Sequence, residues 1–323
     1  METLRSRVII GNYEFKAVKS VTIDSSWGNL VDKAVITTSQ KLTFEGTALS
    51  ELIKVGDKVE IYLNYDPFET KRFEGYVSNI VVDNPMTIEC EDGAWLMKQF
   101  NLDNYSEDST LEDVVKYVFD QGASELQGYS YQITGARKLG QFTIENNPNG
   151  LQVFEELKKT YKIYTYERDK VFYIGFAYSE ELPEAKEINF EKQIISNNLI
   201  YKEADAVKLG VKVKSIHPET NVKTEVFVGE TGGDVITLFD PSGTDNPEEL
   251  REFGEKELEK FKYTGFTGDF LTFLHPYVKH STSVNLTSSR QPERNGEYYI
   301  KRVVTEFGME GGKQTITPDR IRV

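Results

Sequence analysis

Histidine and cysteine are the side chains that most often carry catalysis or bind metals, and this chain of 323 residues has few of them. Its histidines are His217, His275 and His280. The last two are five residues apart around Pro276, a spacing that places them on neither one helical face nor one strand face. The zinc-binding pair of histidines four residues apart with a glutamate is absent. Cys90 is the single cysteine, which excludes an intramolecular disulfide and a thiolate metal cage, and we interpret it as a small buried apolar side chain.

Acidic and glycine-rich segments give no stronger signal for a site. With 52 acidic residues, adjacent pairs such as Glu107 and Asp108 are expected by chance, so no pair of carboxylates stands out for glycoside hydrolysis. Residues 240–249 lack the alternating ligand spacing of a calcium loop, and helix capping accounts for their acids. Residues 229–234 are rich in glycine but contain no lysine, so we interpret them as a hairpin turn rather than a phosphate loop. The sequence predicts no catalytic, cofactor-binding or metal-binding residue and no enzyme.

Charge and hydropathy narrow the range of partners. A net charge of −14 argues against a nucleic-acid surface, because binding phosphates requires clustered lysine and arginine. The acidic balance favours solubility, and it also suits a surface past which DNA must slide without sticking. No apolar run approaches the roughly 18 residues that cross a membrane, and the N-terminus has no signal-peptide pattern. We therefore expect a soluble protein that is made in the cytoplasm, with no membrane insertion and no sequence-specific nucleic acid.

Two stretches far apart in the chain share one order of strands, loops and turns. Each consists of a strand, a polar loop, a β-branched strand with glycine and aromatic residues near its start, and a last strand after a turn. The first copy comprises residues 58–63, 64–72, 73–80 and 86–89, and the second comprises residues 283–286, 287–295, 296–303 and 314–317. If these are two copies of one β-unit, the chain carries two similar surfaces. That arrangement favours assembly over catalysis.

The elements around the repeat predict an α+β fold that is mainly β, with two tube-like antiparallel β-barrels flanking a small α/β middle region. Residues 1–99 alternate as strands do, with a tight hairpin at Gly11 and Asn12, and are predicted to form the first β-barrel. In residues 100–185, a capping pattern at 109–112 predicts a helix that Gly122 ends. A second helix beginning near Asn149 leads into a hairpin. Residues 186–323 are predicted to form the second β-barrel, with an inserted helix that begins after a cap and a proline at residues 245–249.

Aromatic residues in two loops are the candidates for an interface. Tyr65, Asp66 and Phe68 belong to a loop between two strands of the first barrel, and Trp27 lies in an earlier loop. Exposed aromatic residues often anchor interfaces, so a partner could dock on these four residues. The alternative is that they cap the barrel from within the chain.

The layout resembles the baseplate hub proteins of contractile phage tails, a group that includes Mu-like tail proteins and the late control gene D family. Distant relatives of that group form the base of type VI secretion spikes. The resemblance covers nearly the whole chain as an order of strands and turns. One departure is residues 267–281, which lack the Pro-Gly turn expected before the closing strands. The matching segments are residues 18–23, 56–61, 73–77 and 88–92 near the start, 109–119 and 149–175 in the middle, and 296–303 and 311–315 at the end.

The resemblance implies a structural role in a tail. Such hubs are homotrimers in which each chain gives two tube-like barrels, so that three chains present six similar units to a sixfold tail tube and threefold symmetry to a spike. The implied partners are a tail tube protein and a spike protein, with a tape measure protein as a further candidate. The implied location is the baseplate of the virion tail, assembled in the bacterial cytoplasm, and no cofactor is implied. The alternatives are a carbohydrate-binding or adhesin module of a tail, or a tail-associated glycan hydrolase or peptidase.

Overall fold

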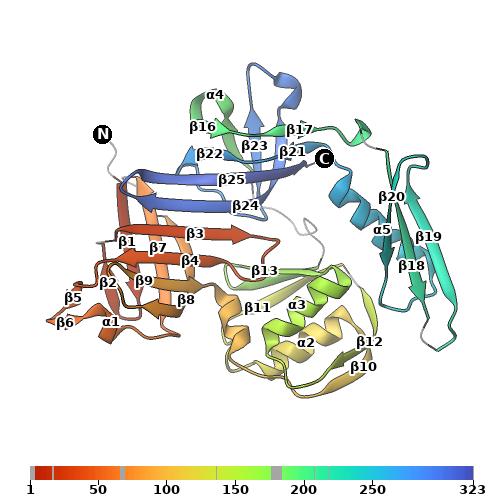
Figure 1. Ribbon diagram of the computed structural model, residues 1–323, viewed down its shortest axis with the longest axis horizontal. Helices are drawn as coiled ribbons and strands as arrows, with labels where there is room; N and C mark the ends of the chain where they lie inside the picture. Colours follow the sequence, from red (N-terminus) through yellow and green to blue (C-terminus); the bar gives the residue numbers. More distant parts are fainter. Residues whose placement is uncertain are drawn as a thin grey trace.

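The computed structural model describes residues 4–16, 18–65, 70–135, 137–175, 184–206, 208–217 and 219–322. Strands predominate among them, which confirms the α+β, mainly β class (Figure 1). Within these residues, no helix has the length and apolar character needed to span a membrane.

Strands from both ends of the chain lie in one continuous sheet, which Figure 1 shows as arrows running side by side. Its order is β16-β22-β25-β24-β3-β4-β9-β8-β7-β1-β2, and four further strands (β15, β17, β21 and β23) branch from this path. The first region supplies β1 (Leu4–Ile10), β2 (Tyr13–Phe15), β3 (Ser20–Ser26), β4 (Lys33–Thr38), β7 (Lys58–Tyr65), β8 (Lys71–Val81) and β9 (Met86–Glu91). The last region supplies β15 (Lys186–Asn189), β16 (Ile194–Asn197), β17 (Ile200–Lys202), β21 (Gly265–Thr267), β22 (Phe270–Phe273), β23 (Ser283–Thr287), β24 (Gly296–Gly308) and β25 (Gly311–Ile321).

The two predicted barrels thus share one open sheet. Among the described residues, no strand pair closes either end region into a barrel, because β3 pairs with β24 of the other region. Each region nevertheless curls around a buried core of its own. The predicted hairpin at the N-terminus is present, with Ile10 opposite Tyr13 and Gly11 at a positive φ of 55°. Short elements lie between β4 and β7: β5 (Thr43–Phe44), β6 (Thr47–Ala48) and α1 (Leu49–Leu52).

The middle of the chain forms a compact α/β unit below the sheet in Figure 1. Its helices begin at capping boxes. Thr110 caps α2 (Leu111–Gln121) with Asp113, and Asn149 caps α3 (Gly150–Tyr161) with Gln152. The other elements are η1 (Gly93–Lys98), β10 (Tyr105–Thr110), β11 (Ser130–Thr134), β12 (Lys138–Ile144), β13 (Tyr164–Arg168) and β14 (Val171–Gly175).

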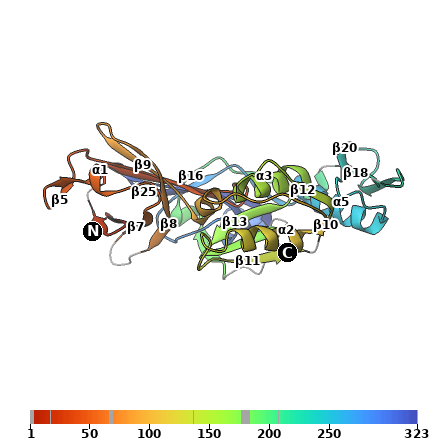
Figure 2. The same cartoon turned by 90° about the horizontal axis from the view of Figure 1, so that it is seen from below.

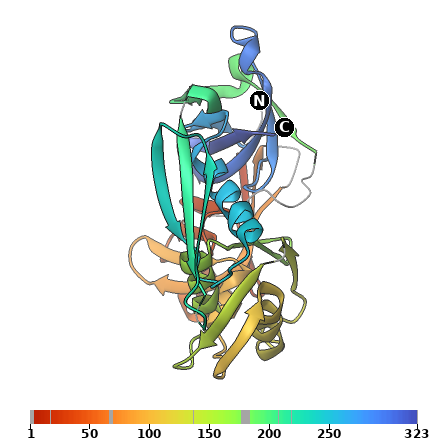
Figure 3. The same ribbon diagram turned by 90° about the vertical axis from the view of Figure 1, so that its right-hand side faces the viewer.

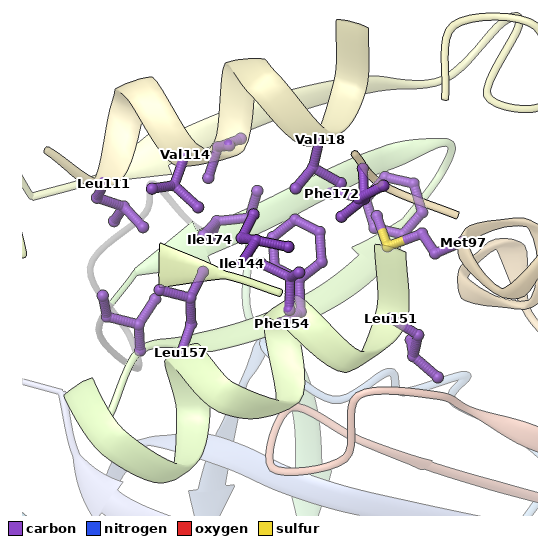
Figure 4. Close-up of a cluster of buried hydrophobic side chains, with 14 of the residues drawn as sticks. Met97, Leu111, Val114, Val118, Ile144, Leu151, Phe154, Leu157, Phe172 and Ile174 are labelled. Atoms are coloured by element: carbon purple, nitrogen blue, oxygen red, sulfur yellow. The ribbon is translucent and has the colours of Figure 1, made fainter. Parts of the chain in front are cut away.

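Buried apolar side chains fill the space between α2 and α3 (Figure 4). The helical spacing of Val114, Val118, Phe154 and Leu157 places them on the facing sides of the two helices. Met97 of η1 belongs to the same cluster, so this core begins before residue 100.

The last region contains a second core that the sequence did not predict. A small sheet of β18 (Leu209–Ile216), β19 (Lys223–Gly229) and β20 (Asp234–Phe239) packs against the inserted helix, α5 (Pro247–Phe261). Leu250 and Phe253 of the helix contact the valines of the sheet in a separate hydrophobic cluster. Figures 2 and 3 show this unit at one end of the molecule, beyond the large sheet. The remaining short elements are α4 (Phe190–Gln193), η2 (Ala204–Ala206) and η3 (Pro292–Arg294).

We predict that Phe154→Ala destabilises the middle unit by about 3–5 kcal/mol, because the ring is fully buried and its removal leaves a cavity. The free energy of unfolding in urea is the measurement. Phe261→Ala, at a ring that is half exposed at the end of α5, is the control and should change it by much less. A loss below about 1 kcal/mol for Phe154→Ala would contradict the packing described here.

Candidate functional site

The two predicted repeat copies form the same three-stranded antiparallel unit, with β7, β8 and β9 in one copy and β23, β24 and β25 in the other. Their registers correspond residue for residue. Lys58 lies opposite Tyr76 in the first copy, and Ser283 lies opposite Tyr299 in the second. Ile80 lies opposite Ile88 in the first copy, and Val303 lies opposite Ile316 at the equivalent position of the second copy.

Both copies also carry one irregularity at the same position. The register of the second strand shifts between Val77 and Asn79 in β8, and between Ile300 and Arg302 in β24. Such a bulge bends the strand and increases its twist. The two copies therefore share local shape as well as strand order.

The turn before each repeat is held by the same pair of backbone hydrogen bonds. Val77 N–H donates to Asp57, and Gly56 N–H donates to Val77. In the second copy, Ile300 N–H donates to Thr282, and Ser281 N–H donates to Ile300. Gly56 and Ser281 both have a positive φ. Ser281 thus takes the left-handed position that a glycine occupies in the first copy, within the segment where the sequence lacks the expected Pro-Gly turn.

The repeat extends to six strands on each side. In sheet order the first copy is β1-β7-β8-β9-β4-β3 and the second is β15-β23-β24-β25-β22-β16, and each order is reached by the same path along the chain. The pairing of the outermost strands differs, since β1 is antiparallel to β7 whereas β15 is parallel to β23. The loop between β3 and β4 corresponds to the long insertion that contains β18, β19, β20 and α5.

The two copies join where β3 pairs with β24. Six residue pairs run from Ser26 opposite Arg302 to Val21 opposite Phe307. β24 uses one edge for two partners, because its first residues pair with β23 and its last residues pair with β3. Hydroxyl groups reinforce the ladder, since Ser26 Oγ donates to Lys301 O at 3.1 Å.

An ion pair lies on the surface of this junction. Arg302 donates two hydrogen bonds to the carboxylate of Asp24, at 2.8 and 2.7 Å. The two side chains are 48% and 36% exposed. The hydrogen bonds to Asp24 raise the pKa of Arg302 above its ordinary value. An ion pair with this exposure contributes little stability, so the backbone ladder carries the junction.

A cluster of polar side chains links the first region to the segment before β23. His280 Nε2 lies 3.0 Å from Asp32 Oδ2, and its Nδ1 lies 3.1 Å from Ser281 Oγ. Asp32 N–H donates to Asp92 Oδ2 at 2.9 Å. Arg168 of β13 donates to Ser281 O at 2.8 Å. The cluster therefore ties the first, middle and last regions to one another.

Asp92 of this cluster is buried, and Glu167 of β13 nearby is half-buried. Burial raises the pKa of Asp92 well above its ordinary value, and the nearby carboxylates of Asp32 and Glu167 raise it further. Burial likewise raises the pKa of Glu167, although a backbone hydrogen bond from Lys170 opposes the shift. Both carboxyl groups are consequently easier to protonate in the folded chain than in the unfolded chain.

Arg72 forms a second link between the first and last regions. Its Nε donates to Leu63 O at 3.2 Å, and its Nη2 donates to Leu274 O. The guanidinium carbon lies 4.2 Å from the centroid of the Tyr277 ring. Burial lowers the pKa of Arg72 to about 10. Leu274 itself packs into the core of the first region.

The structure places two of the four predicted interface residues. Trp27 is 7% exposed, and its ring packs edge-on against Tyr164 with the centroids 4.7 Å apart. The hydroxyl of Tyr65 donates to Gly312 O at 2.9 Å. Asp66 and Phe68 lie outside the described residues. Binding of a partner by these four residues remains a prediction.

The residues that could do chemistry are dispersed. His280 is buried in the polar cluster and His275 is exposed. Cys90 is buried, and burial raises its pKa to about 12. Within the described ranges, no group of three histidine, cysteine or acidic residues could hold a metal ion. Sequence reasoning missed the polar cluster and the Asp24–Arg302 pair, because their members are far apart in the chain and follow no spacing pattern.

Comparison with known proteins finds the same fold in tail proteins. No protein-family model and no curated protein matches the sequence. A tail protein from Neisseria meningitidis MC58 superposes with a TM-score of 0.71 and 12% identity over 98% of this chain and 96% of the other. The 43 kDa tail protein of prophage MuSo2 from Shewanella oneidensis gives 0.69 and 12%, over 98% of each chain. The c3393 protein of E. coli, a component of the type VI secretion system, gives 0.58 and 9%, over 99% of this chain and 77% of the other.

These similarities establish a shared fold. Because the coverage is nearly complete, the fold includes both copies of the repeat and the middle unit. The resemblance to tail proteins that the sequence suggested is thereby confirmed at the level of the fold.

We predict that a double-mutant cycle with Arg302→Ala and Asp24→Ala gives a coupling energy below about 1 kcal/mol, since both side chains are partly exposed. Urea denaturation of the four proteins measures it. A coupling energy above about 2 kcal/mol would show that the ion pair, rather than the ladder, holds the junction.

We also predict a pH-dependent gain in stability for Glu167→Gln. Because its pKa is raised, Glu167 keeps its proton in the native state at pH values at which the unfolded chain releases it, from about pH 4 upwards. The wild-type carboxyl group therefore lowers the free energy of unfolding as the pH rises above about 4. The amide keeps an oxygen that can accept the hydrogen bond from Lys170. Relative to wild type, the variant should therefore gain free energy of unfolding between about pH 4 and pH 7.

Thermal and urea unfolding across that range test the sign. Glu155→Gln, at an exposed position on α3, controls for the loss of one negative charge. An advantage of Glu167→Gln that shrinks as the pH rises would contradict a raised pKa of Glu167.

Proposed function

We propose that this chain is a structural hub of a phage-like tail, in which three copies form a ring. Each chain contributes two copies of one β-unit, so three chains would present six similar units in pseudo-sixfold order. Such a ring matches a sixfold tail tube on one side and a threefold spike on the other. The observation that carries this proposal is the internal repeat, which preserves strand order, register, bulge and turn in both copies.

The fold similarity supports a role in a tail. Neighbours with this fold include two tail proteins, one of them from a prophage, and a component of the type VI secretion system. The proposed partners are a tail tube protein, a spike protein and a tape measure protein, and the proposed location is the tail baseplate. The role is mechanical rather than enzymatic.

The exposed face of the sheet suits the wall of a lumen. One row of side chains crosses the junction between the two copies, and none of its members is buried. From one end to the other it consists of Asn79, Glu89, Val35, Thr22, Glu306, Lys313 and Phe273. This row is mostly polar, and the chain carries a net charge of −14. A polar wall on an acidic protein would let DNA or cargo pass without binding it.

Native mass measurement followed by imaging along the particle axis tests the hub. The expected result is a particle of three copies with a central opening and six similar lobes, alone or on the tail tube protein. Two or six copies, or a chain that stays monomeric with the tube protein present, would contradict it. A monomer that binds glycans would favour the adhesin alternative instead.

A further inference from the structure

The second strand of the repeated unit has a pairing partner along the whole of one edge in the second copy. In the first copy, the end of that edge has no partner among the described strands. β24 extends beyond β23, and β3 occupies the edge that this extension offers. β8 extends beyond β7 in the same way, because its ladder with β7 ends at Tyr76 and its contact with the turn ends at Val77. Among the described residues, no strand pairs with this edge of β8 from Asn79 to Val81.

The segment of the second copy that corresponds to β3 also has one edge without a partner among the described strands. The equivalent of β3 in the second copy is residues 194–202, which comprise β16 and β17. Two matches set the register: the pair of Ser20 with Thr37 corresponds to Ser196 with Leu271. Likewise, the pair of Asp24 with Lys33 corresponds to Ile200 with Thr267. β16 and β17 pair with β22 and β21 on one side, and no described strand pairs with the other.

We propose that residues 198–202 of one copy pair antiparallel with the end of β8 in the next copy, which builds the ring. This inference rests on the proposed hub and names the contact that joins its subunits. The junction inside the chain supplies the register. Val304 lies opposite Asp24, and their equivalents are Val81 and Ile200. Ile200 of one copy therefore lies opposite Val81 of the next.

The side chains at both edges fit this pairing. Val81, Val82 and Ile200 are 44%, 53% and 66% exposed, although all three are apolar. In the proposed register Val82 lies opposite Leu199, beside the pair of Val81 with Ile200. Pairing would therefore cover apolar surface at the same time as it satisfies an open backbone edge.

The new junction also differs chemically from the one inside the chain. The Asp24–Arg302 ion pair is replaced by Ile200 and Asn79, which carry no charge. Association through this contact should consequently depend little on salt concentration.

The positions of the two edges favour a closed ring. In the sheet order, β16 is at one end, and β22, β25, β24, β3, β4 and β9 separate it from β8 (Figure 1). A contact between two different edges is head-to-tail, and head-to-tail contacts of this kind close into rings when the rotation permits. Within one copy, residues 198–202 cannot pair with the end of β8, because six strands of the same sheet separate β16 from β8. Each edge therefore needs a neighbouring copy.

A cysteine pair tests the register directly. Trp27 N–H donates to Lys301 O, so the alternation of an antiparallel ladder makes Val304 and Asp24 a non-hydrogen-bonded pair with close Cβ atoms. The equivalent pair, Val81 and Ile200, should then lie within reach of a disulfide between copies. We expect the double variant Val81→Cys, Ile200→Cys to give a covalent trimer under a mild oxidant, seen on a non-reducing gel and reversed by a reductant.

The control is Val35→Cys combined with Ile200→Cys. Val35 is also exposed on the same face of the sheet, but it lies on β4, two strands away from β8. This variant should form the same particle by native mass and give no covalent trimer. Ile200→Asp provides a second measurement, because it places a charge in the proposed contact and should shift the particle towards monomer.

The outcomes separate the contact from the hub. A three-copy particle without the Val81–Ile200 disulfide, and without an effect of Ile200→Asp, overturns the proposed contact and leaves the hub standing. A chain that forms neither the particle nor the disulfide, with or without the tube protein, overturns both. A covalent dimer that forms in place of the trimer overturns the head-to-tail contact.

Discussion

The backbone ladder between β3 and β24 is the interaction on which the rest of the structure depends. It joins segments that are 278 residues apart at Asp24 and Arg302, and it turns two curled β-regions into one sheet. Closing so long a loop costs conformational entropy, although that cost grows only slowly with length. The ladder offsets it with a row of backbone hydrogen bonds and with Val21 and Ile23, which are buried. Without this pairing, both edges would be open, as the end of β8 is among the described strands.

The shape of β24 explains how one edge can hold two partners. The bulge after Ile300 follows the residues paired with β23 and precedes those paired with β3. A bulge changes the direction of a strand, so the two partners approach β24 at different angles. β8 has the same bulge after Val77, although no described strand lies beyond it. The bulge therefore belongs to the repeated unit and is not a consequence of the partner strand.

Local sequence signals predicted much of this structure, and long-range pairing marks the limit of what they could predict. The repeat, the helix caps and the hairpin at Gly11 depend on residues that are close in sequence. The cap of α2 uses Asp113 with Thr110, one position later than the pattern at 109–112 indicated, because neighbouring serine and threonine residues can both serve as caps. The single sheet could not be predicted, since the pairing of β3 with β24 leaves no local pattern. The separate core around α5 was missed because its strands alternate as any barrel strands would.

The buried polar cluster sets how the regions are oriented, and its composition argues for specificity more than for stability. Burying Asp92, Glu167 and Arg72 costs solvation free energy, as the directions of their pKa shifts indicate. An apolar contact would avoid that cost but would tolerate sliding between the regions. Hydrogen bonds between regions, such as those of His280 with Asp32 and of Arg72 with Leu274, are satisfied in one arrangement only. In the proposed ring, a subunit that presents the edges of β8 and of residues 198–202 to its neighbours would require a fixed angle between its halves. The cluster would add to the constraint that the ladder imposes, because it ties the regions together.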